Sequence, residues 1–309
     1  MRRGDFAAAW RISDRVLQQR MERAEDCSHW PRHLQYLWKG EPLESRRVLV
    51  RSFHGLGDTI QFVRLIAPLR RRAHTVALAA QPALIELLRT VKGIDRLVPL
   101  CNREPEAEHD VQIELMELPH ALRLSLETIP ARIPYIHVSN CGAPRAPDQW
   151  LHVGIAWRSG EWNQDRCVPE VTVARLAGIA GIRWYSLQYG IPCAPLAAIN
   201  LACREIHVLA ARMSALDLVI SVDTMTAHLA GALGLPTWTL LHHDCDWRWM
   251  SDGDASPWYP TMRLFRQPRS GDWRSVIERA CSALAEMTPS SGAIRVPDTR
   301  SIGYRASSG

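Results

Sequence analysis

The hydrophobic pattern of the first part of the chain alternates between short apolar runs and stretches with helical spacing. Runs that predict buried strands lie at 47–53, 75–80, 96–100 and 110–115, and the segments 58–72 and 82–91 predict helices. Strands that alternate with helices are typical of a parallel sheet covered on both faces.

The same alternation starts again after a segment rich in proline, glycine and small polar residues at 139–149. The later predicted elements are strands at 152–157, 183–188, 217–222 and 237–241 and helices at 169–179, 206–215, 225–233 and 273–287. Two α/β halves joined by a linker predict a ligand-binding cleft between their strand C-termini.

These patterns divide the chain into five parts. They are an N-terminal helical extension at 1–44, an α/β domain at 45–140, a linker at 141–150, a second α/β domain at 151–288 and a disordered tail at 289–309. In the extension, helical spacing over 5–37 places Phe6, Trp10, Val16 and Leu17 on one stripe, and a second short helix is expected at 30–38.

Composition agrees with two globular domains, since 47% of the 309 residues are hydrophobic and 22% are charged. The net charge of +5 comes almost wholly from arginine, which indicates anionic ligands or simply arginine-rich codon usage. Nucleic acid is not an expected partner.

The eight cysteines form no C-x-x-C pair, so neither a zinc module nor a disulfide framework is indicated, and a reducing cytoplasm is the simplest location. Charges interrupt the N-terminal apolar stretch too early for a signal peptide. The uncharged stretch 224–243 contains a Gly-Leu-Pro break and is interpreted as helix, turn and strand, so no transmembrane segment is expected.

A glycine loop, "GLGD", follows the first strand and precedes a helix. We expect Gly55 and Gly57 to allow positive φ and close backbone approach, and the helix N-terminus to offer free N–H groups. The loop has neither the dinucleotide nor the P-loop spacing. Asp58 is either a helix cap stabilised by the macrodipole or a general base that accepts a proton from a substrate hydroxyl.

A second cluster of polar residues follows the strand at 217–222. Asp223 stands at the turn, and Thr224, Met225 and Thr226 present the first N–H groups of a helix, where a diphosphate would fit. His228 lies one turn further along the same face and can reach the same anion. The alternative is that Asp223 caps the helix and His228 packs against a neighbouring strand.

The loop at 158–168 supplies two more cations, Arg158 and Arg166, after the first strand of the second half. Each could neutralise a phosphate group through its guanidinium fork, although lone loop arginines are usually just solvated.

Taken together, these stretches resemble glycosyltransferase family nine, the ADP-heptose:lipopolysaccharide heptosyltransferase-like group, and especially its branch fused to tetratricopeptide repeats. The resemblance covers about 5–287 and rests on "GLGDTIQFVR" at 55–64, "MELPHALRLSLETIPARIPY" at 116–135, "WYSLQ" at 184–188, "DLVISVDTMTAHLAGALGLPTW" at 217–238 and "DWRWMSDGDASPWYPTMRLFRQ" at 246–267. The helical segment 5–38 resembles the last helices of a repeat array.

The resemblance implies a GT-B fold, with two Rossmann-like domains whose parallel sheets face a central cleft, the acceptor in the first and a nucleotide-sugar in the second. It implies that Asp58 is the catalytic base and that no metal or cofactor is required. The donor-binding residues that it implies are Arg166, Gln188, Asp223, Thr224, Met225, Thr226 and His228.

The chain departs from the family pattern at two of these positions. Arg166 stands where heptosyltransferases have a lysine, in a loop that lacks the fuller Asp-Arg-x-Arg-Ser pattern. Met225 stands where they usually have glycine, and its side chain narrows the approach of a phosphate.

The leading hypothesis is an inverting, metal-independent glycosyltransferase that moves a sugar from a nucleotide-diphosphate sugar to a glycan, lipid-linked or protein acceptor. It would act in lipopolysaccharide or surface-glycan synthesis in the cytoplasm, with a peripheral contact at the inner face of the inner membrane left open. The alternative is a non-catalytic nucleotide-sugar-binding or scaffold protein. A sugar-nucleotide epimerase is disfavoured because no Tyr-x-x-x-Lys pair is present.

The aromatic residues of "DWRWMSDGDASPWYP" have two interpretations. Trp247, Trp249, Trp258 and Tyr259 stack on a sugar or lipid acceptor at the cleft, or they seat the closing helix on the N-terminal half.

Overall fold

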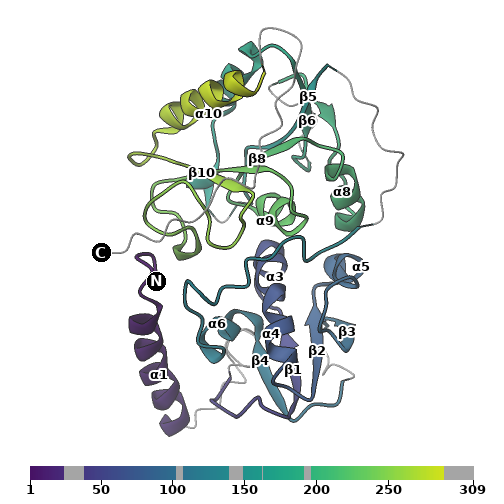
Figure 1. Ribbon diagram of the computed structural model, residues 1–309, viewed down its shortest axis with the longest axis vertical. Coiled ribbons are helices and arrows are strands. Elements are labelled where there is room, and N and C mark those ends of the chain that lie inside the picture. The colour runs from purple at the N-terminus through teal and green to yellow at the C-terminus, as the bar shows by residue number, and fades with distance from the viewer. Residues whose placement is uncertain (24–37, 102–106, 139–148, 162, 191–195, 289–309) are drawn as a thin grey trace. The chain divides into compact units, whose positions relative to one another are not determined.

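The computed structural model describes residues 1–23, 38–101, 107–138, 149–161, 163–190 and 196–288. The chain forms two compact units (Figure 1), and each is described by itself. Unit 1 comprises Met1–Pro130 and Tyr135–His137, and unit 2 comprises Ala131–Pro134 and Val138–Gly309. The predicted linker and tail lie almost wholly outside the described residues, as do most of the predicted helix 30–38 and the C-terminal part of the helix predicted over 5–37.

Unit 1 is built on a four-stranded parallel sheet with the order β3-β2-β1-β4. Its strands are β1 (Arg47–Arg51), β2 (Thr75–Ala80), β3 (Arg96–Pro99) and β4 (Val111–Glu114). Val50 lies opposite Leu78 of β2 and Ile113 of β4. All three are fully buried, as expected for a sheet covered on both faces.

The helices of unit 1 are shorter than the sequence pattern predicts. They are α1 (Phe6–Arg23), α3 (Leu56–Phe62), η1 (Val63–Leu65), α4 (Ile66–Arg70), η2 (Pro82–Leu84), α5 (Ile85–Leu88), η3 (Leu115–Glu117) and α6 (Leu118–Ala121). The single helix expected over 58–72 passes through a 3₁₀ turn at 63–65, just before Pro68. Pro68 has no N–H to donate to the carbonyl four residues earlier, so the regular α-helical hydrogen-bond pattern is interrupted in the turn that precedes it.

Helix α1 packs on the α6 segment of unit 1. The indole nitrogen of Trp10 donates to the carbonyl of Leu124 at 2.6 Å, and Asp14 pairs with His120 at 2.8 Å. Val16 does not share the buried stripe predicted for it, since 39% of it is exposed. At about 100° per residue, Val16 lies roughly 80° around the helix from Phe6.

Unit 2 contains a six-stranded parallel sheet with the order β10-β9-β8-β5-β6-β7. Its strands are β5 (Leu151–Ala156), β6 (Ile182–Ser186), β7 (Ile199–Asn200), β8 (Leu218–Val222), β9 (Thr237–Leu241) and β10 (Met262–Arg266). The two edge strands, β7 and β10, are not among the predicted elements. Strand β7 has only two residues, both exposed, and so carries no hydrophobic signal.

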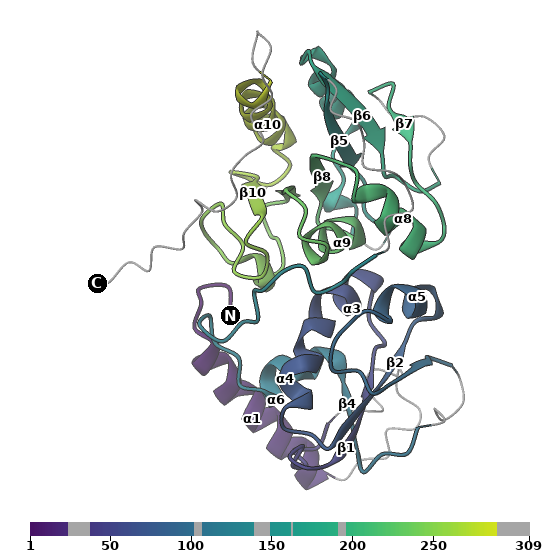
Figure 2. The same ribbon diagram turned by 45° about the vertical axis from the view of Figure 1, so that its right-hand side comes forward.

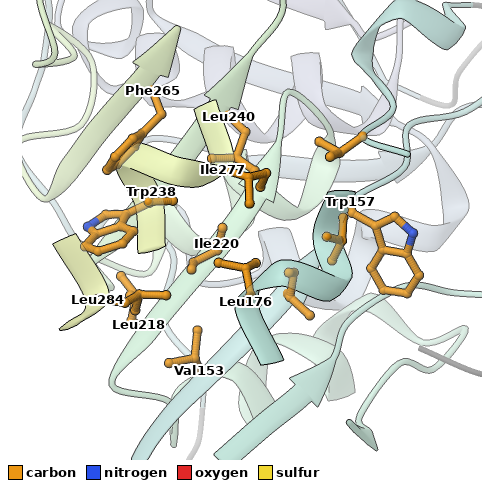
Figure 3. Packing of buried hydrophobic residues seen from close by; sticks show 14 of the residues in the cluster. Val153, Trp157, Leu176, Leu218, Ile220, Trp238, Leu240, Phe265, Ile277 and Leu284 are labelled. Carbon is orange, nitrogen blue, oxygen red and sulfur yellow. The ribbon is translucent and has the colours of Figure 1, made fainter. Parts of the chain in front are cut away.

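Helices cover both faces of this sheet, and Figures 1 and 2 show α8 and α9 on the side opposite α10. The helical elements of unit 2 are η4 (Gln164–Arg166), α7 (Glu170–Val173), η5 (Ala174–Gly178), α8 (Ile206–Met213), α9 (Met225–Ala232), η6 (Trp247–Trp249) and α10 (Trp273–Met287). On the α10 side, Ile277 and Leu284 pack against Leu218, Ile220 and Trp238 of the sheet (Figure 3).

Both sheets reverse their strand order beside the first strand of the unit. Counted within each unit, the orders are 3-2-1-4 and 6-5-4-1-2-3, so the reversal lies between β1 and β4 in unit 1 and between β5 and β8 in unit 2. Ligands of open parallel sheets bind beyond the carboxyl ends of the strands at such a switch point. The prediction of α/β halves with parallel sheets is confirmed.

Candidate functional site

The switch point of unit 1 is bordered by the glycine loop. Helix α3 begins at Leu56 with Gly55 as its N-cap, and Asp58, the third helical residue, accepts a hydrogen bond from the Gly55 N–H at 3.0 Å. Asp58 therefore forms the side-chain-to-backbone half of a capping box, so the capping interpretation describes one contact that its carboxylate makes.

The expectation of positive φ in this loop is wrong. Gly55 has φ −65° and ψ 159°, and neither it nor Gly57 is among the glycines with positive φ. Gly57 is already helical, because α3 begins one residue earlier. A Cβ added at Gly55 would lie 3.1 Å from Oδ2 of Asp58, while close approach of this backbone to a ligand stays a prediction.

A chain of polar side chains holds the loop on its β2 side. Thr59 Oγ1 donates to Oε1 of Gln81 at 2.9 Å, and Nε2 of Gln81 donates to the carbonyl of His54 at 2.7 Å. The hydroxyls of Ser52 and Thr59 also contact each other. Gln81 directly follows β2, so the neighbouring strand fixes the conformation of the loop.

Glu114, the last residue of β4, holds the loop from the other side of the switch point. Its Oε1 accepts the N–H of Phe53 at 3.3 Å, its Oε2 accepts the N–H of Met116 at 2.6 Å, and His54 Nε2 lies 3.6 Å from Oε2. Burial raises the pKa of Glu114 to about 8, and the two backbone N–H groups only partly oppose this. The nearby charge of Asp58 raises this pKa a little further.

Sequence reasoning did not single out Glu114 as functional. The available signal was an acidic residue that closes the apolar strand "DVQIEL". A carboxylate at the end of a buried parallel strand faces the edge where ligands bind.

In unit 2, strand β8 borders the switch point as β4 does in unit 1, and the turn between β8 and α9 lies at its carboxyl end. Thr224 is the N-cap of α9, and its hydroxyl accepts from the N–H of Thr226 at 3.4 Å. Met225 is the first helical residue and is half-buried. As predicted, the helix ends before Gly234, whose φ of +77° and bond to Gly231 form a Schellman-type cap.

Asp223 is buried and paired across the switch point with Arg166 from η4. Arg166 Nη1 lies 3.5 Å from Asp223 Oδ2 and donates to the Asp223 carbonyl at 3.3 Å. Burial raises the pKa of Asp223, while the charges of Arg166 and Arg248 oppose that rise. Arg248 is itself buried and held by Asp246 at 2.9 Å, and the sequence reasoning did not select it.

His228 completes this cluster. Its Nε2 lies 3.8 Å from Oδ1 of Asp223, its Nδ1 lies 3.0 Å from the hydroxyl of Tyr259, and its ring stacks on Trp249 with centroids 5.2 Å apart. His228 is only 3% exposed, and Trp249, Trp258 and Tyr259 are fully buried. These three aromatic side chains are therefore buried in unit 2 and are not exposed for stacking on an acceptor. The seating of the closing helix on the N-terminal half stays a prediction.

Gln188 lies two residues beyond the end of strand β6, and its Oε1 accepts the N–H of Arg158 at 3.0 Å. It thus contacts the loop that carries Arg166. His242 directly follows β9, and burial together with the charge of Arg166 lowers its pKa. Of the predicted donor residues, the structure joins Arg166, Asp223 and His228 most directly, and Gln188 borders this group.

In the part of the chain that the structure describes, no group of three or more His, Cys, Asp or Glu side chains could hold a metal ion. No helix among the same residues is both long and apolar enough to span a bilayer.

Comparison with known proteins finds no family model that matches the chain. Protein FlbA of Caulobacter vibrioides is 24% identical over 298 residues, which cover 82% of this chain and 48% of that protein. The chain therefore spans about half the length of this curated relative.

Solved structures with a similar fold are glycosyltransferases. A glycosyl transferase family 9 structure from Veillonella parvula has a TM-score of 0.58 at 13% identity, with 80% of this chain and 98% of that chain covered. E. coli heptosyltransferase WaaC with ADP has a TM-score of 0.52 at 13% identity, with coverage of 78% and 99%. E. coli ADP-heptose LPS heptosyltransferase II has a TM-score of 0.51 at 15% identity, with 78% of this chain and 99% of that chain covered. The chain thus has the GT-B type of fold found in these heptosyltransferases.

Proposed function

We propose that this protein is an inverting, metal-independent glycosyltransferase of family nine, in the repeat-associated branch, that uses an ADP-heptose-like nucleotide-sugar. One observation carries the proposal. In a chain with this fold, each of the two switch points presents the chemistry that one half of the reaction needs. Unit 1 offers a carboxylate on a helix N-terminus, and unit 2 offers an arginine and a helix N-terminus suited to a diphosphate.

In unit 1, Asp58 is the general base. The acceptor hydroxyl transfers its proton to the carboxylate of Asp58 as its oxygen bonds to the anomeric carbon of the donor sugar. The bond from that carbon to the diphosphate breaks at the same time, and the nucleoside diphosphate departs on the opposite face, which inverts the anomeric configuration. The dipole of α3 favours a negative charge at the position of Asp58 before the reaction.

In unit 2, the leaving diphosphate gains negative charge as the bond breaks. The N–H groups at the start of α9, the guanidinium of Arg166 and the imidazole of His228 are placed to stabilise that charge. The negative charge of Asp223 would repel a phosphate. The guanidinium of Arg166, 3.5 Å from the Asp223 carboxylate, offsets that repulsion.

The test is Asp58→Asn. The asparagine oxygen can still accept the Gly55 N–H, so the cap persists while the basic carboxylate is lost. We expect transfer to fall about a hundredfold to ten-thousandfold while nucleotide affinity measured by calorimetry stays near that of the parent.

The matched control is Asp272→Asn. Asp272 also caps a helix, α10, through a bond from the Ser275 N–H at 3.1 Å, and it lies outside the proposed machinery. This variant should transfer sugar at the parent rate. An Asp58→Asn variant that does the same would show that Asp58 is only a cap.

The capping bond of Asp58 is also the observation that favours a second candidate, a non-catalytic protein that binds nucleotide-sugars or serves as a scaffold. The Asp58–Gly55 hydrogen bond accounts for a carboxylate at this position without any catalysis. Calorimetry with a panel of nucleotide-sugars, paired with transfer assays, separates the candidates. Binding without turnover on glycan, lipid-linked and protein acceptors would favour the scaffold.

The acceptor and the cellular location are further parts of this proposal. We propose a hydroxyl of a growing lipopolysaccharide, surface glycan or glycosylated protein as the acceptor, and the cytoplasm, at the inner face of the inner membrane, as the location. Both are tested by fractionating cells and by comparing surface glycans with and without the gene.

A further inference from the structure

Tyr259 lies against helix α9 at a position where the helix has no side chain. A Cβ built on Gly231 would approach the Tyr259 ring to 2.4 Å, closer than any real contact, so only glycine at position 231 admits the ring. Three residues before Gly231, on the same face of α9, is His228. The ring packed on Gly231 places its hydroxyl 3.0 Å from His228 Nδ1.

The other contacts of His228 leave its ring little freedom. It stacks on Trp249 with 19° between the planes, and both residues are buried. The opposite ring nitrogen, Nε2, lies 3.8 Å from the Asp223 carboxyl. The imidazole is therefore held between a hydroxyl on Nδ1 and a carboxyl near Nε2.

The two polar neighbours of the ring favour one tautomer of a neutral His228. In a neutral imidazole, one nitrogen donates and the other accepts. The carboxyl oxygen of Asp223 favours a proton on Nε2, which leaves Nδ1 to accept the hydroxyl proton of Tyr259.

We propose that Tyr259 is a positioning residue that keeps the proton of the neutral His228 ring on Nε2, and that glycine is required at position 231 because it admits the Tyr259 ring. The functional part of this inference rests on the proposed glycosyltransferase activity. There, Nε2–H is a fixed hydrogen-bond donor beside Asp223 at the N-terminal turn of α9, which an oxygen of the sugar diphosphate would accept, and Tyr259 determines that it donates.

The test uses the full-length protein with ¹⁵N-labelled histidine, with His228→Gln to assign the His228 signals. Nitrogen shifts and couplings report which ring nitrogen carries the proton, whether or not the protein has any activity. Tyr259→Phe removes only the hydroxyl and keeps the ring on Gly231. Gly231→Ala displaces the ring itself.

Unit 2 contains a matched control pair. Tyr185 places its hydroxyl 2.8 Å from Nδ1 of His152, and these two rings are also stacked. His152 is near the start of β5, away from the carboxyl ends of the strands. Tyr185→Phe deletes an equivalent bond and should leave the His228 signals and sugar transfer unchanged.

We expect the wild-type His228 to carry its proton on Nε2 and Tyr259→Phe to produce a mixture of tautomers. The Kd for the nucleotide-diphosphate sugar should rise about fivefold to tenfold, the effect of one hydrogen bond, with a smaller change for the free nucleoside. A wild-type proton on Nδ1, or the same tautomer in Tyr259→Phe, overturns the proposal. A tautomer that changes as expected in a protein that transfers no sugar supports the role of Tyr259 and refutes only the glycosyltransferase.

Discussion

Glu114→Gln should change how the stability of unit 1 depends on pH. The folded protein holds the Glu114 proton more tightly than the unfolded chain does, because burial raises the pKa from 4.5 to about 8. The sign follows from that direction. The stabilisation is complete below the unfolded pKa of 4.5 and is lost as the pH rises through the folded value of about 8.

The magnitude can be estimated from the same shift. At about 1.4 kcal/mol per pH unit, a rise from 4.5 to about 8 corresponds to a loss on the order of 5 kcal/mol in the free energy of unfolding across that range. A glutamine side chain does not titrate, so this dependence should vanish in the variant. The substitution also lowers the free energy of unfolding by an amount that does not depend on pH. The amide has only one acceptor oxygen for the two N–H groups of Phe53 and Met116. An unmet N–H costs about 1–3 kcal/mol.

The two contributions have opposite signs, so the stability difference between the proteins should reverse. Near pH 5 the variant should be less stable than the wild type, and near pH 9 it should be more stable. Hydrogen–deuterium exchange of peptides over 47–62 and 111–118 measures this difference, with wild type and variant compared at equal pH so that intrinsic exchange rates cancel. Glu86→Gln, at a glutamate whose side chain is 57% exposed, is the control and should change little. A difference between wild type and Glu114→Gln that stays constant over this range would refute the reasoning.

Two further predictions concern packing in unit 2. Gly154→Ala places a Cβ 2.5 Å from a carbon of a neighbouring leucine side chain, so thermal denaturation should show a free energy of unfolding lower by about 1–3 kcal/mol. Gly178→Ala is the control and should not show that loss, because the added Cβ would meet no neighbouring atom within 4 Å. Arg266→Lys removes the guanidinium that donates to several carbonyls of the loop at 249–253, so protease cleavage in that loop should accelerate and Trp249 fluorescence should shift. Arg263→Lys, at a side chain that is 45% exposed, is its control, and equal cleavage rates in the two variants would contradict the role of Arg266.

The strand–helix order could be predicted from the sequence because buried parallel strands appear as continuous apolar runs. The run 237–241 coincides with β9, and the helix expected at 225–233 differs from α9 by one residue. Polar residues at the helix start and a Gly-Leu-Pro break at its end mark those boundaries locally. The prediction of one helix over 58–72 was less accurate. The interruption near Pro68 depends on one missing N–H within an otherwise continuous hydrophobic pattern.

The contacts that organise each site were harder to predict, because they join residues far apart in the sequence. Asp58 and Asp223 could be selected because each sits between a strand and a helix. Glu114 holds a loop 61 residues away, and Tyr259 bonds to a histidine 31 residues away. No periodicity within either segment records such a pairing. The role of Gly231 was also hidden, since its need for glycine arises from a ring that approaches α9 and not from its own φ.

The two units share a charge arrangement that their sequences do not reveal. In each unit, an acidic side chain at the end of the fourth strand lies close to a basic side chain that follows the first strand, across the switch point. Glu114 lies 3.6 Å from His54 in unit 1, and Asp223 lies 3.5 Å from Arg166 in unit 2. Burial raises the pKa of both acids, but the bases differ in kind. Arginine stays charged at every physiological pH, so the pair in unit 2 keeps its cation. The imidazole of His54 is a cation only when it is protonated, so the pair in unit 1, unlike that in unit 2, is an ion pair only in that form.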